Sequence, residues 1–140
     1  MRRNAVLMSQ LRDEASIFEQ AGGADAIKAL VDHFYSLVEQ DPVLRPMFPQ
    51  DLEPGKRYQF LFLCQLFGGE PVYSVERGHP RLRMRHFPFP IDRTARDHWL
   101  SHMLSAIDAV GIPEPARGAM QAYFERASEH MINRGSEEHP

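Results

Sequence analysis

Arginine and histidine side chains are concentrated between residues 77 and 91, in the stretch RGHPRLRMRHFPFPI. Four arginines, Arg77, Arg81, Arg83 and Arg85, and two histidines occupy its first ten residues, and aromatic residues and prolines follow at once. Arginine binds phosphate, so nucleic acid is one class of ligand for this stretch. Because charge and apolar surface lie side by side, an anionic ligand with an apolar body is the other.

His86 is the best candidate for a metal ligand in this stretch. It precedes FPFPI and lies just ahead of the predicted helix that carries Trp99. A histidine held at a pocket wall by rigid flanking structure can present a neutral imidazole nitrogen to iron. A lone histidine is more often a surface or hydrogen-bonded residue, so this interpretation depends on what the other helices place beside it.

His98 and His102 are one helical turn apart and share a face, so they could bind a metal ion together. A closed zinc site needs four ligands, and the nearest carboxylate in the sequence, Asp97, points about 100° further round the helix. The sequence therefore does not favour a metal at this pair.

Three polar side chains fall on or beside otherwise apolar helix faces: Tyr35, Gln59 and Trp99. Buried tyrosine hydroxyl and indole N–H groups need hydrogen-bond partners. If the three converge, they suit a small polar ligand in an apolar cavity. Glycine-rich phosphate loops, CxxC, HExxH and the serine-hydrolase elbow are absent from the sequence. The single cysteine, Cys64, lies in an apolar run and is interpreted as a buried hydrophobic residue.

The elements that must position these residues are helical. Between residues 24 and 40 the apolar side chains have the spacing of a helix with one buried face, at Ile27, Leu30, Val31, Phe34, Tyr35 and Val38. Asp92 is a good N-cap for a further helix that ends at Gly111, and a last helix begins near Pro115.

Two other segments are expected to be helical. A short helix is predicted near residues 16–20, and residues 53–67 form a helix so apolar that we expect burial on more than one side. Residues 70–90 hold many glycines and prolines, so they are predicted as a loop with a short helical turn at residues 82–86. With no alternating strand pattern, the fold class is all-α.

Length and composition describe an ordinary globular protein of 140 residues with a formal net charge of -3. This length predicts one domain over residues 1–140, with a core at about 16–133 and polar tails at both ends. There is no apolar run long enough for a membrane span, and the N-terminal segment does not resemble a secretory signal. We therefore expect a cytoplasmic protein.

Taken together, several motifs resemble the truncated haemoglobins of group II. They are GHPRLRMRHFPF followed by ARDHWL, FY in the second helix, and FGGEPVYS ahead of the arginine stretch. The resemblance extends from about Phe18 to Asn133. It implies a truncated globin fold, a compact helical sandwich around a pocket for haem b.

The resemblance also implies roles for individual residues. His86 matches the proximal ligand of the haem iron. Tyr35 and Trp99 match distal donors, and Gln59 and Gly55 match two further distal positions on the E helix. Arg85 and Tyr73 match residues that reach the haem propionates, with Arg57 as a further anchor. The remaining haem contacts are Phe48, which matches the family's aromatic residue, and Phe62, Leu66, Phe89 and Met103 from the apolar helix faces.

The family's chemistry implies binding of O2, NO or CO at a pentacoordinate-capable iron. Bound oxygen takes on partial negative charge, so donors aimed at it slow its release and favour redox chemistry over storage. Conversion of nitric oxide to nitrate and reduction of peroxide are the expected reactions. Either reaction would need an outside electron-donor protein, so whether the chain is an enzyme stays open.

Two alternatives use the same residues differently. A gas or redox sensor would share the haem site and require a signalling partner. A nucleic-acid-binding module would use Arg77, Arg81, Arg83 and Arg85, but the acidic net charge and the lack of a second basic helix disfavour it.

Overall fold

Helices account for all the regular secondary structure in the part of the chain that the computed structural model describes, residues 15–81, 84, 86 and 89–134. The expected all-α class is confirmed. The elements are α2 (Ile17–Ala21), α3 (Gly23–Glu39), a 3-10 helix (Arg45–Met47), α4 (Glu53–Leu66), α5 (Val72–Arg77), α7 (Arg93–Val110) and α8 (Ala116–His130).

The helix ends follow local capping chemistry. The Ser16 hydroxyl accepts a hydrogen bond from the Glu19 N–H at 3.1 Å at the start of α2, and the Asp92 carboxylate accepts one from the Ala95 N–H at 2.8 Å at the start of α7. Gly111 ends α7 in the left-handed conformation, with φ 80°. The cap and the stop expected for this helix are both confirmed.

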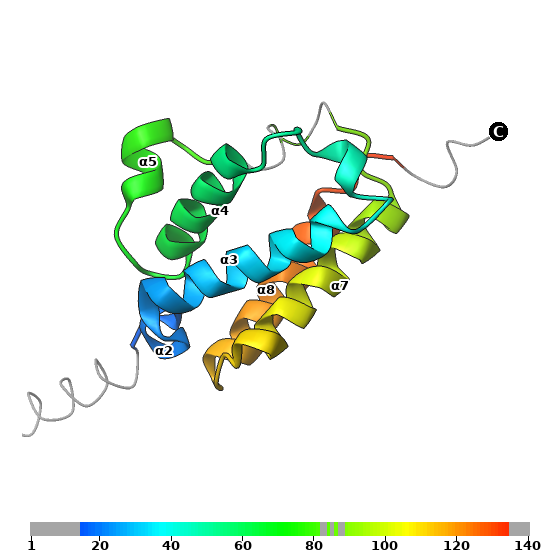
Figure 1. The fold of residues 1–140 in the computed structure, drawn as a ribbon. Helices are drawn as coiled ribbons and strands as arrows, with labels where there is room; N and C mark the ends of the chain where they lie inside the picture. The colour runs from blue at the N-terminus through cyan, green and yellow to red at the C-terminus, as the bar shows by residue number, and fades with distance from the viewer. Residues whose placement is uncertain (1–14, 82–83, 85, 87–88, 135–140) are drawn as a thin grey trace, which may run out of the picture.

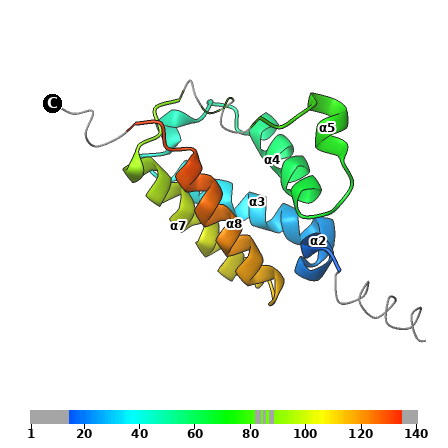
Figure 2. The same ribbon diagram turned by 180° about the vertical axis from the view of Figure 1, so that it is seen from behind.

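Helix α3 runs through the middle of the molecule and packs against α4 and against α7 (Figure 1). Helices α7 and α8 lie side by side and run in opposite directions, as the view from behind also shows (Figure 2). The core between them is fully buried and consists mainly of Ile27, Leu30, Phe34, Met103, Ile107, Met120 and Phe124.

One prediction for residues 70–90 is wrong. Residues Val72–Arg77 form a helix where the sequence predicted a loop. The side chain of Gln65 on α4 stabilises this short helix, because its amide donates to the Ser74 hydroxyl at 2.7 Å and its carbonyl accepts from the Ser74 N–H at 2.9 Å. Of the helical turn predicted at residues 82–86, Met84 and His86 are helical and the other residues lie outside the described part.

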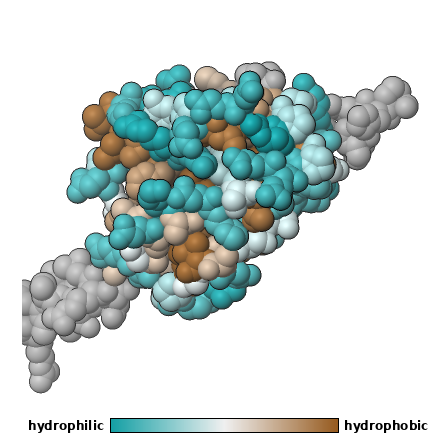
Figure 3. Space-filling view, in the orientation of Figure 1, coloured by the Kyte–Doolittle hydropathy of each residue, from teal (hydrophilic) through white to brown (hydrophobic). Residues whose placement is uncertain are grey.

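Helix α4 is less buried than its composition predicted. Only Leu63 and Cys64 of this helix are buried, and Leu66 is 38% exposed. Phe62 and Leu66 border hollows, whereas Phe60 is only partly buried against the core. Figure 3 shows a mainly hydrophilic surface with hydrophobic atoms exposed over α5, where Val75 is 82% exposed. None of the described helices has the length and apolar character that crossing a membrane requires.

Candidate functional site

A cavity of about 340 Å³ lies between the helices, within the size range of small-molecule sites. Its walls come from α3, residues 44–49 around the 3-10 helix, α4, α5, α7, α8 and the segment before α7, and most of the side chains are aromatic or aliphatic. Eight of the residues that the sequence singled out line it: Tyr35, Phe48, Gln59, Phe62, Tyr73, His86, Phe89 and Trp99. Residues far apart in the sequence therefore meet at one apolar hollow.

The two aromatic donors are held by edge-to-face packing. The ring of Tyr35 meets that of Phe48 at 5.8 Å between centroids, and Trp99 meets Phe34 at 5.4 Å and Phe124 at 5.8 Å. Tyr35 is 5% exposed, and burial raises the pKa of its hydroxyl to about 12. Tyr35 therefore stays protonated, and so able to donate a hydrogen bond, throughout the physiological range.

Gln59 carries the one buried side-chain polar atom that has no hydrogen-bond partner among the described residues. The atom is its carbonyl oxygen, and the side chain borders the cavity. Leaving a buried acceptor unpaired costs about 1–3 kcal/mol. Such an atom in a cavity wall is a natural partner for a donor that enters the cavity or turns toward it.

Gly55, one turn before Gln59 on α4, lies against the Tyr35 side chain. A methyl group at Gly55 would come within 2.9 Å of the Tyr35 hydroxyl oxygen, closer than such contacts occur in proteins. The absence of a side chain at Gly55 thus gives the tyrosine hydroxyl its place beside the cavity.

The segment that carries His86 is held by a residue that the sequence analysis missed. The Asn133 side-chain amide donates to the carbonyl oxygens of Phe89 at 2.8 Å and His86 at 3.3 Å, and its oxygen accepts from the Ile91 N–H at 2.9 Å. The Asn133 backbone N–H also donates to the Ile91 carbonyl. Because Asn133 lies between the last helix and the polar C-terminal tail, no local pattern indicated this role.

Arg96 also borders the cavity and was not predicted. Its side chain is 13% exposed and donates to the Ser128 hydroxyl at 3.0 Å and to the Glu125 carbonyl at 3.1 Å. It also pairs with Asp97 at 3.1 Å and with Glu129 at 3.6 Å. Its charge is therefore balanced by acidic neighbours, and it links α7 to α8 at the cavity wall.

Two of the predicted apolar contact residues do not border this cavity, and the predicted arginine anchors are not placed at it. Met103 is fully buried in the core and does not border the cavity. Leu66 borders a second, more open hollow that is also lined by Phe62 and Met131. Arg85 lies outside the described residues, and Arg57, expected as a further anchor, pairs with Glu76 at 2.9 Å.

Of the four arginines in the opening stretch, the structure describes Arg77 and Arg81. Arg77 lies over the ring of Tyr58 at 4.3 Å and Arg81 is exposed, whereas Arg83 lies outside the described residues, as Arg85 does.

Tyr73 is 4% exposed and its ring packs edge-to-face on Phe62 at 5.5 Å, at the cavity wall.

His98 and His102 meet a carboxylate that the sequence analysis did not identify. His98 Nδ1 lies 2.8 Å and His102 Nε2 lies 2.6 Å from Oδ2 of Asp41, which follows α3 in the chain. Burial by itself would raise the pKa of Asp41, but hydrogen bonds from both histidines and from the N–H groups of Val43 and Leu44 lower it. The carboxylate expected nearest the pair, Asp97, instead pairs with Arg96.

A model of the bacterial-like globin family matches residues 16–133. The chain is 44% identical over 114 residues to the group 2 truncated hemoglobin YjbI of Bacillus subtilis, a match that covers 81% of this chain and 86% of that protein. Its structure is similar to that of the hemoglobin from Chloroflexus aurantiacus, with a TM-score of 0.85 and 57% identity over 86% of this chain and all of that one. For the truncated oxygen-avid haemoglobin from Bacillus subtilis the TM-score is 0.81 and the identity 42%, over 84% and 99% of the two chains.

Proposed function

Because this chain belongs to the bacterial-like globin family and is a group II truncated haemoglobin, we propose that it holds haem b in the cavity and binds O2, NO and CO there. The observation that carries the proposal is the convergence of Tyr35, Gln59 and Trp99 on a cavity that also has His86 in its wall. The oxygen-avid relative in Bacillus subtilis supports oxygen as a ligand.

The residues that line the cavity fit haem. Phe48, Phe62 and Phe89 would supply the apolar contacts that a porphyrin needs, and the unpaired Gln59 oxygen offers an acceptor in the cavity wall for a donor such as the Tyr35 hydroxyl. Haem iron would supply an open coordination position for a diatomic ligand.

His86 holds the iron in this proposal. The hydrogen bonds that Asn133 makes to the backbone of His86, Phe89 and Ile91 hold the backbone at the residue that presents this imidazole. A fixed backbone restricts where the ring can point, so Asn133 acts as a positioning residue. Tyr73 and Arg85 would serve the haem propionates.

Tyr35 and Trp99 are the donors to the ligand. The indole N–H can only donate, and the Tyr35 hydroxyl keeps its proton because burial raises its pKa to about 12. Gln59 either supports the Tyr35 hydroxyl as an acceptor or contacts the ligand. Donors fixed in advance in an apolar site stabilise partial negative charge on an oxygen ligand more than they would in water.

Such stabilisation slows ligand release, which favours redox turnover over oxygen storage. We propose conversion of nitric oxide to nitrate or reduction of peroxide as the reaction, with an electron-donor protein as the partner that renews the reduced state. We expect the protein to work in the cytoplasm.

The direct test is the absorption spectrum of the protein supplied with haem, in the ferric, dithionite-reduced and carbonmonoxy forms, beside the His86→Gly variant. One haem per chain, a response to carbon monoxide and disruption by the substitution are expected. A folded protein that takes up no haem would refute the proposal. Stopped-flow oxygen release from Tyr35→Phe and Trp99→Phe then tests the donors, since unchanged rates in both variants would exclude the distal network.

A further inference from the structure

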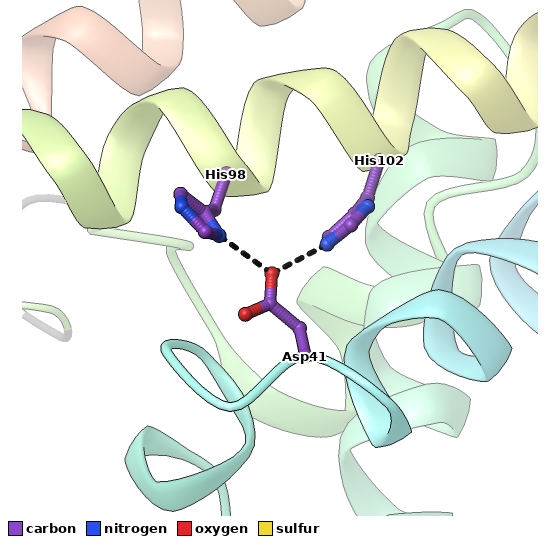
Figure 4. Close-up of side chains that lie close together, drawn as sticks. All are labelled: Asp41, His98 and His102. Atoms are coloured by element: carbon purple, nitrogen blue, oxygen red, sulfur yellow. Dashed lines mark hydrogen bonds and ion pairs between the residues drawn. The ribbon is translucent and has the colours of Figure 1, made fainter.

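A second group of ligand atoms lies outside the cavity. Nδ1 of His98, Nε2 of His102 and a carboxylate oxygen of Asp41 all lie within 4.8 Å of one another. Figure 4 shows both imidazole rings pointing from α7 toward the Asp41 carboxylate, which comes from the turn after α3. None of these three residues, here called the Asp41 cluster, borders the cavity.

The carboxylate of this cluster is positioned in advance. Its Oδ1 accepts from the Val43 N–H at 2.8 Å and from the Leu44 N–H at 3.3 Å, which leaves Oδ2 for the two histidines. Metal-binding carboxylates are commonly held in this way by hydrogen bonds to the oxygen that does not bind the ion. The Asp41 side chain is only 4% exposed, and among the described residues no lysine or arginine forms an ion pair with it.

Solvent reaches the cluster from the histidine side. The side chains of His98 and His102 are 39% and 22% exposed, so an ion has a path to the site, and water can complete its coordination. The two rings lie on successive turns of one helix, so the backbone already holds both nitrogens on the side of α7 that faces Asp41.

We propose that the Asp41 cluster binds a divalent transition-metal ion, with Zn²⁺ as the probe of choice. Two imidazoles and one carboxylate, with a solvent position left open, are a ligand set that Zn²⁺ accepts at bond lengths of about 2.0–2.2 Å. On binding, each coordinating nitrogen gives up its hydrogen bond to Asp41, and a neutral ring keeps its proton on the other nitrogen.

The two histidine–carboxylate separations need only a small adjustment for binding. Ligand atoms around a tetrahedral ion at these bond lengths are about 3.4 Å apart. The two N···Oδ2 separations of 2.8 and 2.6 Å must therefore open by less than 1 Å. The partly exposed rings can rotate to do this, whereas the hydrogen-bonded carboxylate stays in place.

The test is equilibrium dialysis of the full chain against Zn²⁺, with metal counted per chain. We expect one ion for the wild type and for the control His33→Gln, which alters a half-buried histidine of α3 that lies outside the cluster. His98→Gln and His102→Gln should each weaken binding by more than about tenfold, because loss of a direct ligand should cost at least as much as loss of a supporting residue. Asp41→Asn should do the same.

The histidine variants keep the test decisive if Asp41→Asn fails to fold, because both rings are partly exposed and their replacement leaves the core intact. Zinc X-ray absorption of the wild type should give two imidazole ligands, and the double variant His98→Gln/His102→Gln should lose that signature. Equal zinc binding by the wild type and the double variant would overturn the proposal, as would a wild type that binds no zinc. Haem uptake, measured on the same samples by absorption, reports on the proposed function separately.

Discussion

The Tyr35 hydroxyl lies so close to Gly55 that a single methyl group on that glycine would approach the hydroxyl oxygen to within 2.9 Å. The phenol ring cannot move away freely, because its faces and edges are packed against Phe34 and Phe48 at centroid distances of 5.5 and 5.8 Å. The position of the Tyr35 hydroxyl, the proposed hydrogen-bond donor to bound oxygen, therefore depends on a residue of the neighbouring helix α4.

Gly55→Ala should displace the Tyr35 hydroxyl and speed oxygen release. A lost hydrogen bond of about 1 kcal/mol corresponds to about fivefold in rate. Stopped-flow oxygen dissociation measures this, with Gly118→Ala as the matched helix-glycine control on α8. In a Tyr35→Phe background the same change should have little effect, because the displaced group is already absent. Equal effects in both backgrounds would mean that Gly55 acts by another route.

The Tyr35 hydroxyl should ionise only at high pH. Its pKa in the folded protein is raised by burial to about 12, above the ordinary value of 10.0. A raised folded pKa means that stability from the neutral phenol is fully present below pH 10 and is lost as the pH rises toward 12. The difference in absorbance at 295 nm between wild type and Tyr35→Phe should show this titration. A midpoint near 10 in folded protein would contradict the expected burial.

Cys64 should be nearly inert toward thiol reagents. It is 8% exposed, and burial raises the pKa of its thiol from 9.0 to about 11. A rise of this size lowers the thiolate fraction by about a hundredfold at neutral pH. Labelling with a disulfide reagent at pH 8 should be slow in native protein and complete within minutes in guanidinium chloride. Equal rates in both conditions would exclude a buried thiol.

Asn133→Ala should loosen the segment around His86. The substitution removes three side-chain hydrogen bonds, to His86, Phe89 and Ile91. We expect the free energy of unfolding to fall by about 1–3 kcal/mol and haem transfer to apomyoglobin to accelerate. Arg134→Ala is the control, since the Arg134 backbone N–H keeps its own bond to the Ile91 carbonyl. A stability loss without faster haem transfer would limit Asn133 to a purely structural role.

The sequence could predict the secondary structure of residues that depend only on neighbours within one or two helical turns. Apolar side chains three or four positions apart share one face of a helix, and the caps at Asp92 and Gly111 act through hydrogen bonds over the same short spacing. For the same reason the inward faces that carry Tyr35 and Trp99 could be identified before the structure. The helix at residues 72–77 could not, because Gln65 holds its Ser74 through contacts that lie outside the local sequence.

By itself the sequence determined the helices, the polar side chains on their apolar faces and, through family motifs, the kind of protein. Only the tertiary structure brought Asp41 to His98 and His102 across separations of 57 and 61 residues, or placed Asn133 beside the His86 segment. Local propensity carries no information over such distances. The packing of the buried faces of α3, α7 and α8 decides which surfaces of the molecule meet. That packing in turn decides which polar side chains become hydrogen-bond partners.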